Sequence, residues 1–247
     1  MEKVRFEVSL NGERLCTAGV GGYGVLMATI LMTSHLKAEA SVSQMVTIPH
    51  EYDLNFGVSA LECNDSVENR HLTWINRSLR EGDELRVRIL PEGHIDPPIL
   101  SFSDHASSCV NEEDIASGDE DDGYPPEDPP QDKDASGQVR FEVLANGTRL
   151  CIAGIDGNGI LFGHVVSTSR HPNYARAHHL EGESAKDEMY MTIQGLDSSQ
   201  TETEFRLVWI REHPLQFGDV ILVRLLPPGE CDAPTRLPSP EQAKNRD

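Results

Sequence analysis

Two cysteines are the first residues of this chain to consider for chemistry. Cys16 and Cys151 occupy matching places in two similar stretches of sequence. A cysteine becomes a strong nucleophile when a histidine is held beside it in an activating field. Each of these cysteines instead follows a hairpin signal on a strand-like stretch, where a buried small hydrophobic residue is the usual occupant. We therefore expect both to be structural.

One connector gathers imidazoles and carboxylates, which are ligand types for zinc: His171, His178, His179, Glu181 and Glu183. His178 and His179 are consecutive rather than spaced to share a helix face, and the matching connector of the first stretch has no equivalent. The acidic runs Glu112–Asp114 and Asp119–Asp122 lack the spacing of an EF-hand calcium loop. The sequence therefore predicts no metal and no cofactor.

A glycine-rich loop, Gly19–Gly24, returns as Gly154–Gly159. A phosphate loop needs a strand before it, a helix after it and usually a lysine or hydroxyl for the anion or metal. The stretch after the second loop, Ile160–Thr168, has a central glycine and several β-branched residues, which favour a strand. No phosphate-loop lysine is present, so we interpret both loops as turns.

These residues belong to an internal repeat. The segment Val4–Gly19 returns as Val139–Gly154 at an offset of 135 positions, and about half of the positions over the first thirty are identical. The same offset holds at Trp74 and Trp209, after which one residue is gained and equivalents differ by 136. Self-similarity of this quality predicts a duplicated domain.

Each copy has the pattern of a series of strands. Val4–Leu10 alternates apolar and polar residues, as a half-buried strand does. Asn11-Gly12 and Asn146-Gly147 follow the first strand of each copy and predict a two-residue hairpin turn. Further strands are predicted around Leu54–Ala60, His71–Ile75, Glu84–Leu90, Met189–Gly195, Phe205–Ile210 and Val220–Leu226. About six strands per copy without a helix predict an all-β protein of two small sandwich-like or barrel-like domains.

The alternative is a pair of ubiquitin-like β-grasp domains, in which Gly24–Thr33 would form the helix that lies across the sheet. The segment Leu79–Ile89, with its Gly-Asp turn and apolar strand, resembles the end of sulfur-carrier proteins of that fold. The same combination of turn and strand occurs in many β-barrels.

The composition divides the chain into four parts: a first domain 1–97, a disordered acidic and proline-rich linker 98–137, a second domain 138–229, and a flexible tail 230–247. The linker holds about half of the excess negative charge. Low hydrophobicity with like charges does not repay the cost of ordering.

The formal net charge of −20 argues against nucleic acid or an anionic membrane surface as a partner and favours a basic protein. No apolar leader and no apolar run of membrane-spanning length is seen, and the five cysteines show no C-x-x-C spacing. We expect a cytoplasmic protein with reduced thiols.

No motif specifies a reaction, so we expect a non-enzymatic protein-binding or adaptor protein. Trp74 and Trp209 are predicted as core anchors, with partner binding as the alternative because aromatic residues dominate binding hot spots. Two other functions stay open: an acidic, immunity-type inhibitor of a basic protein, and a ubiquitin-like modifier processed near Gly229. The oligomeric state is not predicted.

Overall fold

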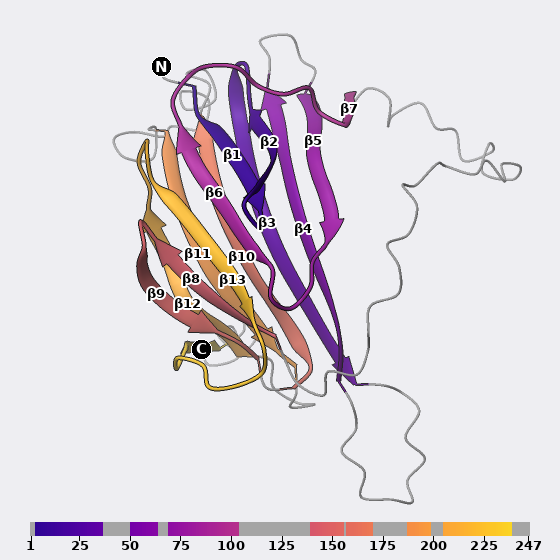
Figure 1. Cartoon of the computed structure of the whole chain (residues 1–247), viewed down its shortest axis with the longest axis vertical. Coiled ribbons are helices and arrows are strands. Elements are labelled where there is room, and N and C mark those ends of the chain that lie inside the picture. The colour runs from indigo at the N-terminus through magenta and orange to yellow at the C-terminus, as the bar shows by residue number, and fades with distance from the viewer. Residues whose placement is uncertain are drawn as a thin grey trace, which may run out of the picture.

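The computed structural model describes residues 3–36, 50–63, 69–103, 139–155, 157–169, 187–198 and 205–238. Within these ranges every helix or strand element is a strand, and the strands form two sheets that face each other (Figure 1). The all-β prediction is confirmed. Neither sheet closes on itself, so the architecture is a sandwich and the barrel form of the prediction is wrong.

The first sheet, sheet A, has six strands in an antiparallel arrangement. Their order is β2 (Glu13–Gly19), β1 (Arg5–Leu10), β6 (Glu84–Leu90), β13 (Val220–Leu226), β8 (Arg140–Ala145) and β9 (Thr148–Ala153).

The second sheet, sheet B, has eight strands, again antiparallel to their neighbours. Their order is β14 (Thr235–Pro238), β12 (Phe205–Pro214), β11 (Glu188–Asp197), β10 (Gly159–Ser169), β3 (Tyr23–Leu36), β4 (His50–Cys63), β5 (Asn69–Ser78) and β7 (Leu100–Ser103).

The two similar halves of the sequence share both sheets. In sheet B, β3 pairs with β10 so that Thr29 lies opposite its equivalent His164. In sheet A, β6 pairs with β13 so that Arg86 lies opposite its equivalent Leu222. An approximate two-fold axis therefore passes through these two residue pairs and relates the halves. The division of the chain into two separate domains stays a prediction.

The predicted segment boundaries shift slightly in the structure. Strand β7 uses Leu100–Ser103 from the segment predicted as linker, and β14 uses Thr235–Pro238 from the segment predicted as tail. The rest of the predicted linker, residues 104–137, and residues 239–247 lie outside the described residues.

The Asn-Gly turns form as predicted. Asn11 and Asn146 have φ angles of 52° and 51°, and the glycine after each also has a positive φ. The Asn11 side chain donates to Asp83 Oδ1 and accepts from the Glu84 amide, each at 2.8 Å. This fastens the hairpin to the Gly-Asp turn before β6, and the same bonds recur in the second half.

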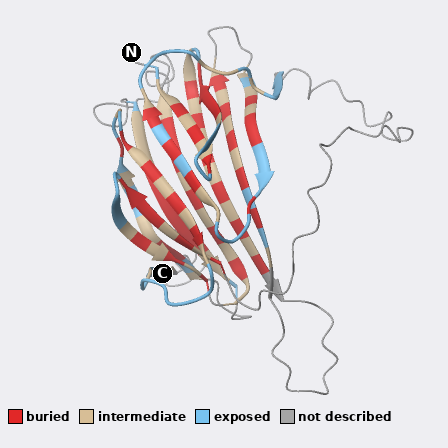
Figure 2. Ribbon diagram, viewed as in Figure 1, coloured by how far each residue is buried: buried red, intermediate tan, exposed pale blue. Residues whose placement is uncertain are grey.

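The β-grasp alternative is wrong, because its predicted helix lies within β3. Leu26, Ala28, Ile30 and Met32 alternate toward the core and are almost fully buried, which is the period of a strand (Figure 2). Gly24 also fits a strand, at a point where the backbone of the neighbouring strand β4 approaches closely. Its φ is 149°, and a Cβ there would lie 2.0 Å from the Leu61 carbonyl oxygen.

Candidate functional site

Trp74 and Trp209 hold the segments that cross from sheet A to the outer edges of sheet B. The Trp74 indole Nε1 donates to the Asp96 carbonyl at 2.7 Å, and the Trp209 indole Nε1 donates to the Asp232 carbonyl at 2.8 Å. Trp74 is 5% exposed, whereas Trp209 is half-buried. The structure thus gives each tryptophan an anchoring contact, and a role in partner binding stays a prediction.

Gly229 lies in the crossover segment to which Trp209 donates, and Trp74 donates to the other crossover segment. The Arg140 guanidinium donates to the carbonyls of Pro227 at 2.7 Å and Glu230 at 2.5 Å. A Cβ at Gly229 would come within 2.9 Å of the Arg140 Cζ. The chain therefore turns tightly around this guanidinium at Gly229 before it continues into β14, and processing near Gly229 stays untested.

The two equivalent cysteines are buried in the core. Burial, followed by the charge of Asp96, raises the pKa of Cys16 to about 11. Burial, followed by the charge of Asp232, raises the pKa of Cys151 to about 12. Both thiols are therefore protonated at neutral pH, which makes them weak nucleophiles.

The candidate metal ligands do not come together in the part of the chain that the structure describes. The histidine-rich connector and both acidic runs lie outside the described residues. Within those residues, no three His, Cys, Asp or Glu side chains gather in a way that could hold a metal ion.

A cavity of about 470 Å³ lies at the glycine-rich loop of the first half, a size that suits a small ligand. Gly21, Gly22 and Gly24 line it together with hydroxyl side chains of β10, and its charged lining residues are Lys3 and Asp187. The Gly21 amide already donates to Glu62 Oε1 at 2.8 Å. A carboxylate bound to the loop argues against an anion site, in agreement with the interpretation as a turn.

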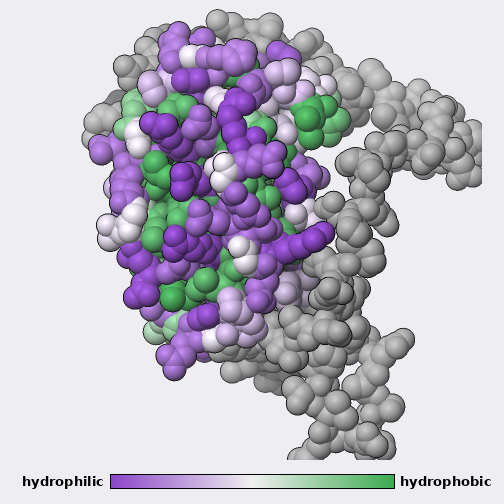
Figure 3. Space-filling model, viewed as in Figure 1, coloured by the Kyte–Doolittle hydropathy of each residue, from purple (hydrophilic) through white to green (hydrophobic). Residues whose placement is uncertain are grey.

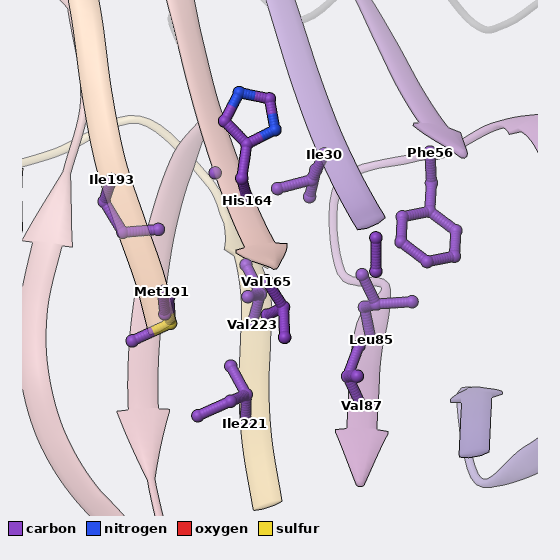
Figure 4. Close-up of a pocket in the computed structure, with 12 residues that line it drawn as sticks. Ile30, Phe56, Leu85, Val87, His164, Val165, Met191, Ile193, Ile221 and Val223 are labelled. Carbon is purple, nitrogen blue, oxygen red and sulfur yellow. The ribbon is translucent and has the colours of Figure 1, made fainter. Parts of the chain in front are cut away.

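A second, much smaller cavity of about 20 Å³ lies between the sheets on the two-fold axis (Figure 4). Apolar side chains of both halves line it. Ala28 and its equivalent Gly163 have little or no side chain, so they do not fill this space. An apolar cavity of this kind stays dry. His164 borders it through its backbone strand, and Figure 4 shows its ring pointing away from the cavity.

The outer face of sheet A carries several ion pairs. Arg224 donates to Glu84 at 2.9 Å and to Glu142 at 3.2 Å, and these hydrogen bonds raise the pKa of Arg224. Arg88 lies 3.9 Å from Glu7 on the neighbouring strand. Figure 3, which looks onto this sheet, shows a mainly hydrophilic surface with separate apolar patches. Such a face is well solvated.

The outer face of sheet B has the opposite character across its four central strands. The segments Asn55–Leu61, Val25–Thr33, Ile160–Thr168 and Tyr190–Leu196 contain no Asp, Glu, Lys or Arg. We call the outward side of these four segments the uncharged face. Its large apolar side chains are half-buried or buried and include Val25, Met27, Leu31, Ile160, Phe162 and Val166.

His164 lies near the centre of the uncharged face. Its Nδ1 is 3.0 Å from the Thr29 hydroxyl, and its other cross-strand neighbour is Thr192. Burial lowers the pKa of His164, so the imidazole is neutral at neutral pH. The imidazole on the uncharged face therefore adds no charge there.

Sequence analysis missed the apolar residues at one edge of sheet B. Ile99, Leu100 and Phe102 are 63%, 60% and 57% exposed, and Phe102 stacks on His71 with ring centroids 4.9 Å apart. The available signal was an apolar cluster with Leu100 and Phe102 in alternation, between Pro98 and the acidic segment. It was hidden because the surrounding composition is that of a linker.

Comparison with protein-family models, characterised proteins and solved structures returned no match. Among the described residues, no helix has the length and apolar character needed to cross a membrane.

Proposed function

We propose that this chain is a non-enzymatic protein-binding protein that receives a basic partner on the uncharged face of sheet B. The observation that carries this proposal is the absence of Asp, Glu, Lys and Arg from the central segments of four adjacent strands. A partner can cover such a face without the cost of desolvating an ionic group. Interface centres are likewise depleted of charged residues and enriched in aromatic residues and methionine, as Phe162 and Met27 exemplify here.

The contrast with sheet A supports this choice of surface. The ion pairs around Arg224 are solvated, and covering them would remove water from several charges at once. At the border of the uncharged face, Arg206 donates to the Gln194 side chain at 2.8 Å. The surface thus has a centre without charged residues and a charged border, and depletion of charge at the centre is usual in a protein interface.

The charge of the whole chain favours a basic partner. Residues 104–138 contain twelve acidic residues and one lysine, which is more than half of the net charge of −20. This charge accelerates the encounter with a positively charged protein, while the uncharged face supplies the contact. The buried thiols of Cys16 and Cys151 suit a reducing setting, and we place the protein in the cytoplasm.

The test is affinity capture with the full chain as bait, followed by identification of the bound proteins. Phe162→Asp puts a charge on the uncharged face, and Leu222→Asp is the matched control on the outward side of sheet A. The wild type and Leu222→Asp should retain the same basic protein, and Phe162→Asp should lose it. Retention by all three baits would overturn the proposal, provided that thermal unfolding shows all three to be folded.

An acidic inhibitor is the second candidate, favoured by the same concentration of negative charge. It predicts that the captured protein is a basic enzyme and that this chain reduces its activity. Full activity of that enzyme in the complex would leave binding without inhibition. The modifier alternative is not carried further, because the β-grasp fold on which it depended is wrong.

A further inference from the structure

We infer that β7 is a docking edge, at which an extended basic segment of a partner adds to sheet B as a further strand. This inference rests on the proposed protein-binding function but concerns a different surface. The strand order places β7 at the end of the eight-stranded sheet, and among the described residues it pairs with β5 alone. Its other side presents backbone groups as a ready template for an added strand.

The side chains of β7 are unusually apolar for an exposed edge. Ile99, Leu100 and Phe102 are the large hydrophobic residues that stand out as exposed in the described part of the chain. Leu100 and Phe102 pair with Thr73 and His71, so they lie on the outward side of the sheet. They can therefore pack against alternate side chains of a strand placed beside them.

The uncharged face continues to this edge. His71 pairs with Leu61, and Thr73 pairs with Ser59, both of which belong to the uncharged face. A partner on the uncharged face and a strand on β7 would thus form one continuous contact. The nearest basic side chain, Arg70, already donates to Glu62 at 3.4 Å and to the Ser101 hydroxyl at 3.2 Å.

The opposite edge of the same sheet shows what a protected edge looks like here. Strand β14 pairs with β12 in the register that β7 has with β5, so the two strands occupy equivalent places. It carries Arg236 over the Phe205 ring and ends in Pro238, which has no amide hydrogen to donate. Charge and proline are the usual devices against edge pairing, and β7 has neither.

The charge of the segment that follows β7 in the sequence selects the chemistry of the docked segment. The twelve acidic residues and one lysine of residues 104–138 begin directly after Ser103. A second copy of this chain on β7 would bring two such acidic segments together and is disfavoured. A segment in which apolar residues alternate with lysine or arginine suits both the apolar edge and the acidic composition of the residues that follow it in the sequence.

The experiment uses the full chain and a short fluorescent peptide in which valine and lysine alternate, measured by anisotropy. The peptide should bind the wild type. The double substitution Leu100→Ser with Phe102→Ser should weaken binding about tenfold, as expected for the loss of two interface anchors. Leu237→Ser on β14 is the matched control and should leave binding unchanged. Both sites are at an edge, and thermal unfolding verifies the fold.

Three further probes separate strand addition from other modes. A peptide with methylated backbone amides cannot complete a ladder and should not bind, and a peptide with glutamate in place of lysine should not bind either. Equal binding of the methylated peptide would overturn the inference in favour of simple charge attraction. A dimer in sedimentation that the double substitution abolishes would overturn it in favour of a second copy.

The outcomes also distinguish this inference from the proposed function. If Phe162→Asp abolishes partner capture while the β7 substitutions leave peptide binding intact, the docking edge fails and the uncharged face stands. If the peptide binds through β7 but Phe162→Asp retains the partner, the docking edge stands and the proposal for the uncharged face fails.

Discussion

The first and second halves of this molecule have the same framework but differ in what they present to solvent. Equivalent bonds fasten the Asn-Gly hairpins, the tryptophan crossovers and the arginine-wrapped turns in both halves. The halves diverge at the outer edges of sheet B, where β7 is apolar and β14 is charged and closed by proline. Residues retained twice build the sandwich, and residues that differ are the better candidates for binding.

The core phenylalanines give the largest expected effect and test the equivalence of the halves. Phe6 and its equivalent Phe141 are both fully buried. Phe6→Ala and Phe141→Ala should each lower the free energy of unfolding by about 3–5 kcal/mol. Urea denaturation should show a single transition in both variants, because the halves share both sheets.

Phe102→Ala is the control for the core substitutions. Phe102 is 57% exposed, and its loss should change the free energy of unfolding by less than about 0.5 kcal/mol. Two separate transitions, or a large cost in one half only, would contradict the view of one cooperative sandwich.

The tryptophan crossovers should show an intermediate effect that differs between the halves. Trp74→Phe removes the donor to the Asp96 carbonyl in a buried setting and should cost about 1–3 kcal/mol. Trp209→Phe removes the donor to the exposed Asp232 carbonyl, where water can replace it, and should cost about 0.5–1 kcal/mol. Thermal unfolding of the two variants measures the difference, and equal costs would show that burial does not decide it.

The Thr29–His164 pair on the two-fold axis should give the smallest effect on stability, and this effect should depend on pH. Burial lowers the pKa of His164, so below about pH 6.5 the unfolded chain takes up a proton more readily than the folded one. The contribution of His164 to stability is therefore constant above this pH and falls as the pH drops through it.

His164→Thr places on the axis the residue that the first half carries at Thr29. The variant should lose less stability than the wild type between neutral and mildly acidic pH, measured by thermal unfolding. Identical slopes for the wild type and His164→Thr would exclude His164 as the titrating group.

The strands themselves were largely predictable from the sequence. The alternation in Val4–Leu10 and the two Asn-Gly turns are local signals, and the structure follows them. The pairing of β3 with β10 and of β6 with β13 was not predicted, because alternation tells which side of a strand is buried but not which strand lies beside it.

The candidate site was less accessible to sequence reasoning than the fold. Strand β7 has four residues and follows two prolines, so its local propensity was outweighed by the acidic composition that surrounds it. The uncharged face emerges only when four segments distant in sequence are placed side by side. At Gly229 a side chain would meet the Arg140 guanidinium, a contact that no local sequence pattern indicates, and processing near Gly229 stays a prediction.

The axis that pairs Thr29 with His164 and Arg86 with Leu222 has a consequence for how this surface can change. These contacts are isologous, as in a dimer of identical subunits. In such a dimer every substitution would occur twice, and an apolar edge gained on one side would be copied on the other. In a single chain the two halves can change independently. One edge of sheet B can therefore become able to bind a partner while the equivalent edge stays protected.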